Sequence, residues 1–434
     1  MAGAVALSRL TGAVLGGCAL VLLAQSFGSC SSPAESASPK ADAGPDADAA
    51  SETAPPDAEL DSPTDHPTPP WDPVWHEAKP AAFKVVPPGP RRAKSCGAGC
   101  EVIAETDPEG TGQRRPRAND DWAVFQVVPG GRVHAVHLKT EMEYVVDDGK
   151  GWPEGIAAGG GPSVSKDLIF YTVRAWWGSM RIVRSLGTGE AKIVSSSEGS
   201  AGTITTSFAH PFAYWDFGPP DQIFRFDLRD GSISSIPGGG CIILEGASNG
   251  LATCAGEGFV DLIDFDKGTT SKLGSSKYQD IAGSISPDGK TAAWIDTRDP
   301  DSKGAITTYL DPGGGEVYVK ELLSGKETRI TSDSPQGPVI KSFPRLVDGR
   351  LVWQSWAGIP TQLPADLFIW ELPAPVWFAI DGEKPAALTD PMRPVAFPQP
   401  VSSGVVGTLS LANDAGFLDT YLVHIAWPAS TDGG

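Results

Sequence analysis

The sequence has little of what metal centres, nucleic-acid interfaces and long helices require. Its 434 residues include 6 His, 6 Cys and 4 Met, and its 34 Lys and Arg stand against 53 Asp and Glu. The net charge of −19 repels a phosphate backbone, so we expect no nucleic-acid partner. The histidines are scattered along the chain without metal-ligand spacing, so we expect neither a metal nor a cofactor.

The N-terminal hydrophobic run is too short to span a bilayer comfortably. Residues 10–24 are largely apolar, follow Arg9, and precede the small residues that end at Cys30. This order is typical of an export signal, which we place at residues 1–30. A retained membrane anchor is the alternative.

The end of that signal resembles a bacterial lipoprotein signal, in which a cysteine after small residues is lipidated and becomes the mature N-terminus. Residues 27–30 (Phe-Gly-Ser-Cys) depart from the pattern at Phe27, where Leu is usual. Residues 15–18 (Leu-Gly-Gly-Cys) match better locally, but lipidation there would strand an apolar run after Cys18. The resemblance implies lipidation of Cys30 and, because Ser31 rather than Asp follows, an outer-membrane lipoprotein. A secreted or periplasmic protein is the alternative.

Residues 31–80 begin with forty residues, 31–70, that include almost no large apolar side chain. They hold eleven Asp or Glu against Lys40 and Lys79, among many Pro, Ala and Ser. Such a segment cannot bury enough surface to offset its ordering entropy. It is therefore predicted to be a disordered linker, which acts as a stalk.

Glycine and proline are abundant, with 51 Gly and 39 Pro, and both weaken long helices. Turn residues open a short strand at seven places along the chain, at positions 121, 167, 211, 250, 289, 349 and 404. The intervals run from 39 to 60 residues, which is typical of propeller blades rather than of helical solenoids.

Each period also contains an alternating strand, a Gly-containing turn and another strand. The pattern is clear in residues 180–194, 222–236 and 316–330. With the two strands around the first turn, each period supplies the four strands of a blade. The aromatic residue of the second strand, such as Trp294, is expected to pack between neighbouring blades.

Two periods carry a family resemblance. Residues 284–296 (SISPDGKTAAWID) and 316–331 (EVYVKELLSGKETRIT) resemble the repeat of TolB-like β-propellers, and residues 344–356 (PRLVDGRLVWQSW) resemble its variant in exported bacterial propellers. The resemblance implies a fold and a binding role and supplies no catalytic residue. We therefore predict an all-β fold after the linker, a single β-propeller of seven four-stranded blades over residues 82–429. Six or eight blades are the alternatives.

The last period lacks a fourth strand after Trp427. Residues 82–86 (Ala-Phe-Lys-Val-Val) stand just before the first period. They are predicted to complete the last blade and so remove its open edge.

Four cysteines after the signal form two candidate pairs. Cys241 and Cys254 flank the turn at residues 249–250, where a hairpin would bring them together, and export favours their oxidation. Two free thiols are the alternative. Cys96 and Cys100 could close a small loop, and without a second pair or a nearby His they indicate a metal only weakly. Disulfides are expected at both places.

Two further patterns suggest chemistry. Residues 246–250 match the Gly-x-Ser-x-Gly of serine hydrolases, but residues 251–254 are expected to continue as a strand instead of the required helix. Residues 296–301 offer three carboxylates to Ca²⁺ but lack the spacing and the glycine of a calcium loop, so a solvated acidic loop is favoured. No catalytic residue is therefore predicted.

A binding face is predicted where the connections between strands are longest, at residues 296–315 and 356–366 and at Trp176 and Trp177. Packing between blades is the other role considered for these two tryptophans and for Trp356. The expected function is a non-catalytic binding or scaffold module, monomeric and held at the membrane by its lipid, whose partner is a protein or glycan of the cell envelope. The alternative is a propeller enzyme acting on a polysaccharide or lactone, which needs converging carboxylates or a metal in the channel.

Overall fold

A computed structural model describes nineteen stretches of the chain, all within the compact unit of residues 67–434. They are residues 83–86, 96–104, 112–128, 132–148, 157–158, 161–175, 178–198, 206–217, 222–241, 243–256, 259–274, 280–298, 315–332, 339–347, 349–357, 376–380, 385–389, 395–412 and 418–428. Within these stretches the regular structure is entirely β-strand, and no helix there is long and apolar enough to cross a membrane.

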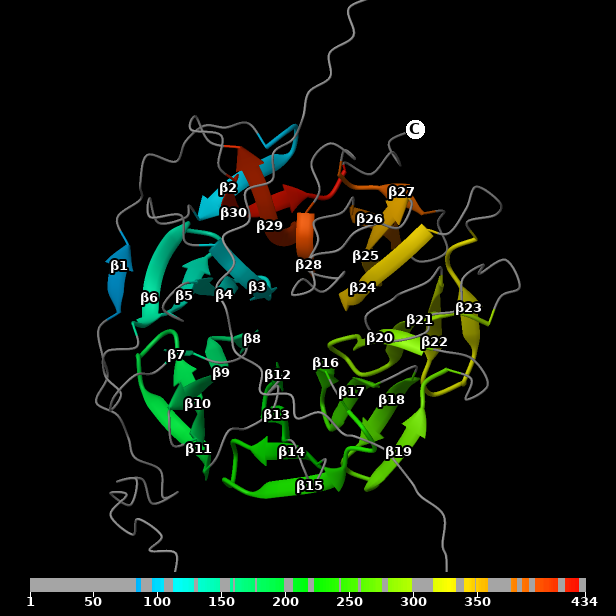
Figure 1. The fold of residues 1–434 in the computed structure, drawn as a ribbon, viewed down its shortest axis with the longest axis horizontal. Helices are drawn as coiled ribbons and strands as arrows, with labels where there is room; N and C mark the ends of the chain where they lie inside the picture. The colour runs from blue at the N-terminus through cyan, green and yellow to red at the C-terminus, as the bar shows by residue number, and fades with distance from the viewer. Residues whose placement is uncertain are drawn as a thin grey trace, which may run out of the picture. The chain divides into compact units, whose positions relative to one another are not determined.

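The strands form seven antiparallel sheets arranged as blades around a central axis (Figure 1). Blade 1 contains β3 (Gly112–Ala118), β4 (Trp122–Val128), β5 (Arg132–His137), β6 (Met142–Asp147) and a fifth strand, β1 (Lys84–Val86). Blade 2 contains β7 (Ala157–Ala158) and β8 (Ser163–Ser165), which both pair with β9 (Leu168–Ala175), then β10 (Gly178–Ser185) and β11 (Ala191–Glu198). Blade 3 contains β12 (Thr206–Ala209), β13 (Phe212–Phe217), β14 (Gln222–Asp227) and β15 (Ile233–Pro237).

The remaining four blades each have four strands. Blade 4 contains β16 (Ile243–Ser248), β17 (Leu251–Gly256), β18 (Phe259–Asp264) and β19 (Thr269–Lys272). Blade 5 contains β20 (Asp280–Ile285), β21 (Thr291–Asp296), β22 (Glu316–Glu321) and β23 (Glu327–Arg329). Blade 6 contains β24 (Val339–Val347), β25 (Arg350–Ala357), β26 (Val376–Ile380) and β27 (Ala386–Ala387). Blade 7 contains β28 (Val395–Val401), β29 (Gly404–Ala412), β30 (Leu418–Ala426) and β2 (Cys100–Ala104). The predicted all-β propeller of seven four-stranded blades is confirmed.

All seven turn positions read from the sequence lie at or beside the turn between the first two strands of a blade, from β3–β4 to β28–β29. Gly250, Gly289 and Gly349 have φ of 78°, 70° and 71°. These left-handed values are accessible to glycine at no steric cost, which explains why the sequence repeats glycine here.

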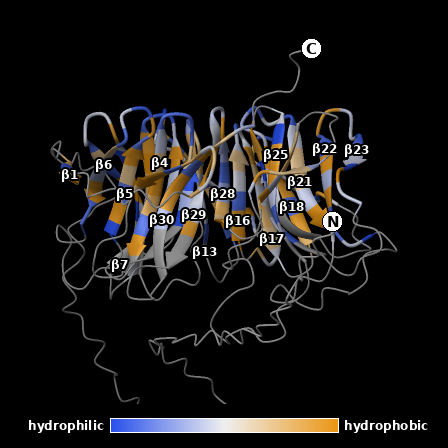
Figure 2. Cartoon of the chain, turned by 90° about the horizontal axis from the view of Figure 1, so that it is seen from above, coloured by the Kyte–Doolittle hydropathy of each residue, from blue (hydrophilic) through white to orange (hydrophobic). Residues whose placement is uncertain are grey.

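Hydrophobic residues are frequent along the strands, and hydrophilic residues gather at the turns along one rim of the ring (Figure 2). Trp294 packs with Val260 of blade 4 and Tyr318 of blade 5, and Trp353 joins a cluster that spans blades 5 and 6. Both tryptophans are almost fully buried. The predicted packing of second-strand aromatics between blades is confirmed for these two residues.

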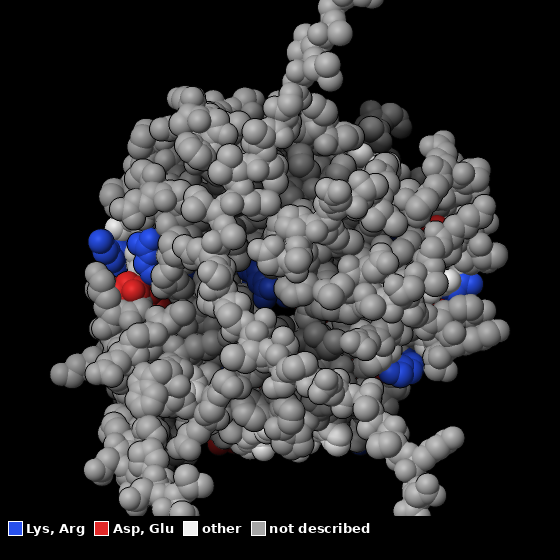
Figure 3. All heavy atoms as spheres, viewed as in Figure 1, with Lys and Arg blue, Asp and Glu red and all other residues white. Residues whose placement is uncertain are grey.

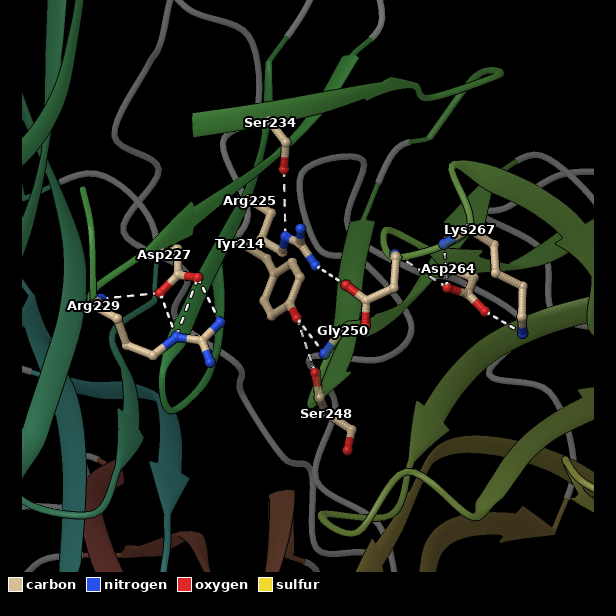
Figure 4. Close-up of polar contacts among 10 residues, drawn as sticks. Tyr214, Arg225, Asp227, Arg229, Ser234, Ser248, Gly250, Asp264 and Lys267 are labelled. Carbon is tan, nitrogen blue, oxygen red and sulfur yellow. Dashed lines mark hydrogen bonds and ion pairs between the residues drawn. The ribbon is translucent and has the colours of Figure 1, made fainter. Parts of the chain in front are cut away.

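Polar contacts also connect adjacent blades, as the contact between blades 3 and 4 illustrates (Figure 4). The hydroxyl of Tyr214 donates to the carbonyl of Ser248 at 2.9 Å and accepts from the amide of Gly250 at 3.1 Å. Arg225 of blade 3 pairs with Asp266, which follows β18, at 2.6 Å. These contacts hold the Asn249-Gly250 turn against the preceding blade.

The strand that closes the ring differs from the predicted one. β2, and not residues 82–86, supplies the fourth strand of blade 7, with Cys100 opposite Ile425 and Val102 opposite Val423. β2 contributes the buried side chains of Ile103 and Ala104 to the core. β1 instead extends blade 1 on its outer side, where Val85 is 42% exposed. Closure by an N-terminal strand is thus correct, but its residues are 100–104.

Candidate binding site in the central channel

The innermost strands of five blades are irregular shortly before their turns. The pairing register shifts once in each of β3, β16, β20, β24 and β28. In three of them the irregular segment contains a proline, namely Pro116, Pro344 or Pro398. Proline lacks an N–H, so it is tolerated where a bulge already interrupts the ladder. The residue after each proline lines the channel, and these residues are Arg117, Arg345 and Gln399.

A cavity of about 370 Å³ lies at the centre of the ring. Every blade contributes to its lining through its innermost strand, with Arg117, Ser163, Ser207, Glu245, Ser284, Arg345 and Gln399 as one residue from each. Seen down the axis, Lys or Arg side chains lie deep in the central opening (Figure 3). The cavity therefore has a mixed lining of apolar and polar residues and carries positive charge.

Two oppositely charged side chains from different blades meet in this cavity. Arg345 of blade 6 places Nη1 3.5 Å from Oε2 of Glu245 in blade 4, and their side chains are 7% and 5% exposed. The same carboxylate oxygen accepts a hydrogen bond from the amide of Gly283 at 2.8 Å. Arg345 Nη1 also donates to the carbonyl of Gly283 at 3.3 Å. Glu245 and Arg345 are therefore held by the backbone of blade 5, which lies between them in the ring.

The guanidinium of Arg117 lies close enough to Glu245 and Arg345 to interact with both charges. Desolvation of the partly buried Arg117 side chain, followed by repulsion from Arg345, lowers its pKa, and the carboxylate of Glu245 partly opposes this shift. A guanidinium nevertheless remains protonated at physiological pH. Arg117 is thus a cation in an environment that disfavours its charge, because one carboxylate lies near two guanidiniums.

Glycines allow blades 4 and 5 to approach each other closely beside this pair. A Cβ on Gly246 would lie 2.8 Å from Thr253 Oγ1 and 2.9 Å from the amide nitrogen of Ile285. A Cβ on Gly283 would lie 2.4 Å from a methyl carbon of Val260. Any larger residue at either position would push the two blades apart and move Glu245 away from the Gly283 amide.

The rim of the cavity is held by contacts between turns of adjacent blades. Asn119 donates to the carbonyl of Lys166 at 2.8 Å, and Asp120 accepts from the amide of Ser402 at 2.7 Å. His210 donates its amide to Ser165 at 3.0 Å. Burial, and then the nearby Lys166, lower the pKa of the His210 imidazole.

Comparison with solved structures identifies the same architecture in other proteins. The β-propeller domain of the Trilobed protease from Pyrococcus furiosus matches 72% of this chain and 95% of its own, with 10% identity and a TM-score of 0.50. A protein assigned as TolB from Agrobacterium tumefaciens (16% identity; 69% and 98% of the chains; TM-score 0.39) and oligogalacturonate lyase from Vibrio parahaemolyticus (12%; 76% and 97%; 0.46) are also similar. No family model matches the sequence, and no curated protein matches it.

The structural likeness extends to the fold alone. At 10% identity to the propeller domain from Pyrococcus, the ring of blades is shared while its channel residues need not be. The chemistry of the site must therefore be read from the residues of this chain.

Both cysteine pairs expected from the sequence are disulfides in the structure. Cys241 joins Cys254 with their Cα atoms 5.7 Å apart, and Cys96 joins Cys100 at 5.4 Å. The first links the segment before β16 to β17 within blade 4, and the second lies at the start of β2. The first pair therefore bridges the inner part of blade 4, and the second closes a small loop at the edge strand β2 of blade 7.

The other residues singled out in the sequence have different outcomes. Trp176 and Trp177 lie outside the described residues, as does Cys30. Trp356 lies in β25 opposite Ile340 of β24. β9 ends at residue 175 and β10 begins at residue 178. These two strand ends lie at the opposite end of blade 2 from the β8–β9 turn, which lines the cavity.

Ser248 does not occupy a nucleophile's position. Its side chain is fully buried, and Oγ donates to the carbonyl of Pro287 at 2.8 Å. The chain continues from it through a turn into β17, as the sequence predicted. Ser248 thus connects blades 4 and 5.

The acidic segment 296–301 is described only at its start. Asp296 is fully buried, and its carboxylate pairs with Arg298 and accepts from the indole of Trp294 at 3.3 Å. Asp299 and Asp301 lie outside the described residues. Across the described stretches, no group of three His, Cys, Asp or Glu is placed to hold a metal.

Sequence reasoning missed the charged residues of the channel, although the sequence contains a signal for them. Pro116, Pro162 and Pro344 each stand five residues before a turn position, at 121, 167 and 349. Each is followed by a residue that lines the cavity: Arg117, Ser163 or Arg345. A proline repeated at one place in a blade therefore marks the position that faces the channel.

Proposed function

We propose that this protein is a non-catalytic binding module of the bacterial cell envelope, which captures a protein or glycan partner at its central channel. The observation that supports this best is the cavity of about 370 Å³ to which all seven innermost strands contribute. A concave site with several polar groups directed into it is the usual form of a ligand pocket.

The charged groups of the cavity favour binding over catalysis. Arg117 and Arg345 keep their protons, so they attract anions but do not transfer protons. Glu245 is the one buried carboxylate among the described residues that line the cavity, and its Oε2 already bonds Gly283 and Arg345. Such groups position a ligand.

The alternative remains an enzyme that acts on a polysaccharide or lactone. One observation favours it: His210 lines the cavity, and burial lowers the pKa of its imidazole. A histidine with a lowered pKa is neutral at pH 7 and can accept a proton. An enzyme of this kind would lose activity when His210 is replaced by Gln, while a binding module would keep its partner.

A channel-filling substitution tests the binding proposal. Val347 lies at the end of β24 and lines the cavity, so Val347→Trp should obstruct it. Ser271, exposed on β19, gives the matched control Ser271→Trp. We expect affinity capture from envelope extracts to lose its partner with Val347→Trp and to keep it with Ser271→Trp. Equal capture by both would show that the partner binds elsewhere, and Trp176→Ala with Trp177→Ala would then test the other face.

We also propose that residues 1–30 are a lipoprotein signal, that Cys30 carries the lipid, and that residues 31–80 link it to the propeller at the outer membrane. The supporting pattern is the run of small residues before Cys30 and the acidic, Pro-rich segment after it. Radiolabelled palmitate should be incorporated by the wild type and by Cys18→Ser, but not by Cys30→Ser. Label that persists in Cys30→Ser would exclude that anchor.

A further inference from the structure

The centre of the channel brings together charges from three blades that are far apart in the sequence. Arg117 comes from blade 1, Glu245 from blade 4 and Arg345 from blade 6, and all three line the same cavity. Burial of charge is costly unless an opposite charge compensates it. Two guanidiniums beside one carboxylate leave an excess of positive charge.

Glu245 is already engaged by the protein and so compensates one guanidinium, that of Arg345. Its Oε2 lies 3.5 Å from Arg345 Nη1 and 2.8 Å from the Gly283 amide. The bulge in β16 falls at Glu245, and the bulge in β20 falls directly before Gly283. The local backbone therefore sets the position of this carboxylate, and the sequence places glycine where the two strands meet.

Arg117 is compensated only in part, because it feels the charge of Glu245 but forms no ion pair with it among the described residues. No hydrogen bond or ion pair among the described residues involves its side chain, although it lines the cavity beside Arg345 and Glu245. Arg115, on the same strand, adds to the excess of positive charge because it repels Arg117 further. Arg117 therefore lines the channel with a charge that no ion pair among the described residues neutralises.

A buried hydroxyl without a partner lies beside the wall of the same space. Ser284 of blade 5 is 2% exposed and lines the cavity, and its Oγ has no hydrogen-bond partner among the described residues. Buried hydroxyls normally have a partner, so an unpartnered one beside a cavity points to a ligand that supplies it. Ser284 lies next to Gly283, whose amide holds Glu245.

We propose that the channel binds an oxyanion, a carboxylate or phosphate group, between Arg117 and Arg345, with the Ser284 hydroxyl as a further donor. Planar guanidiniums match both groups because two parallel N–H bonds fit two oxygens. This inference rests on the channel being the binding site. Glu245 competes with the oxyanion for Arg345. Its carboxylate therefore limits how tightly the site binds the oxyanion, although Glu245 does not itself bind the ligand.

Calorimetric titration of the full-length protein with succinate, inorganic phosphate and uncharged succinamide tests the proposal. We expect succinate or phosphate to bind and to weaken with added salt, and succinamide not to bind. Binding of succinate alone would assign a carboxylate ligand, and binding of phosphate alone a phosphate. Failure of both anions to bind would overturn the proposal.

Substitutions identify the residues responsible. Arg117→Gln should weaken anion binding at least tenfold, and Ser284→Ala several-fold. Arg229→Gln, in the exposed turn after β14 of blade 3, is the matched control and should leave the anion affinity unchanged. Glu245→Gln removes the resident carboxylate and should tighten anion binding several-fold, an effect that a purely structural role would not produce. Unchanged affinity in Arg117→Gln, or weaker affinity in Glu245→Gln with an intact fold, would contradict the assignment.

The same variants separate this inference from the proposed function. If Val347→Trp abolishes partner capture while no anion binds, the channel is the binding site but its ligand is not an oxyanion. If the anions bind wild type and Val347→Trp alike, the anion site is not in the channel and this inference fails, whereas the proposed function fails only if Val347→Trp also keeps partner capture.

Discussion

A single hydroxyl at the contact between blades 3 and 4 meets two backbone groups. Tyr214 is fully buried and bonds both the Ser248 carbonyl and the Gly250 amide. Tyr214→Phe leaves these groups without the hydroxyl, and an unmade buried hydrogen bond costs about 1–3 kcal/mol. We predict a decrease of about 2 kcal/mol in the free energy of unfolding, measured by urea denaturation.

Tyr144→Phe is the control for this prediction. Its ring packs against Phe83 and Trp122, and its hydroxyl makes no hydrogen bond among the described residues. The change should be within about 0.5 kcal/mol. Equal effects in both variants would mean that the Tyr214 hydroxyl does not connect the two blades.

A carboxylate in the same blade makes stability depend on pH. Asp227 accepts from the Arg229 side chain at 2.6 Å and from its amide at 2.9 Å, and these bonds, side chain first, lower the pKa of Asp227 below its ordinary 3.8. A lowered folded-state pKa gives stability that is present above the unfolded value and is lost as the pH falls through the folded value. We therefore predict that Asp227→Asn is less stable than wild type at pH 7.

The difference should begin to shrink below pH 3.8, where the unfolded chain takes up a proton at Asp227. It should vanish once the pH falls through the lower folded-state pKa and wild type loses the same bonds. Thermal melts from pH 7 downward measure it. Asp230→Asn is a comparison on the exposed turn, where a bond with Ser232 lowers the pKa of the Asp230 carboxyl. A stability difference that stays constant with pH for Asp227→Asn would contradict the electrostatic origin.

The channel residues show where sequence reasoning ends. A turn glycine is recognisable because its backbone conformation is a local property, so Gly250 and Gly289 were predictable. Arg117, Glu245 and Arg345 come together only when the ring closes, and no local pattern gives the distance between blades 1, 4 and 6. The proline before Arg117 and before Arg345 indicates that each residue faces the channel. It does not indicate that the two residues lie close together.

At the scale of whole strands, ring closure is the part of the fold that the sequence left undecided. β1 and β2 are both short, contain β-branched residues and come before β3 in the chain, so each fits the open edge of β30 by pattern alone. Strand pairing between distant segments depends on the buried side chains it gains. β2 gains burial of Ile103 and Ala104, whereas Lys84 and Val85 of β1 stay exposed.

This difference predicts unequal effects of deleting the two strands. Removing residues 100–104 exposes the edge of β30 and takes a buried isoleucine from the core, so the melting temperature should fall by more than about 5 °C. Removing residues 83–86 should lower it by less than half as much. Both deletions are made in a Cys96→Ser background, and circular dichroism gives the melting temperatures. A larger effect from residues 83–86 would reinstate them as the closing strand.

At the scale of the whole molecule, the ring is closed by pairing rather than by chain order. β2 lies antiparallel to β30, the amide of Ala426 donates to the carbonyl of Gly99 at 2.8 Å, and Cys100 faces Ile425. The end of β30 and the start of β2 are therefore placed as the two arms of a hairpin. The channel needs only that all seven innermost strands stand in a ring, so a chain that visits the blades from a different start should build the same cavity.

A circular permutant tests this directly. The chain would run from residue 105 to 428, continue through a short Gly-containing turn, and end with residues 96–104, so that β2 follows β30 as an ordinary hairpin. Because closure becomes local, its entropic cost falls, and the melting temperature should equal or exceed that of residues 96–428 in native order. The permutant should also bind the channel ligand with unchanged affinity. A permutant that melts much lower would show that the covalent link from β2 to blade 1 holds the ring together, since every other contact of β2 would have been kept.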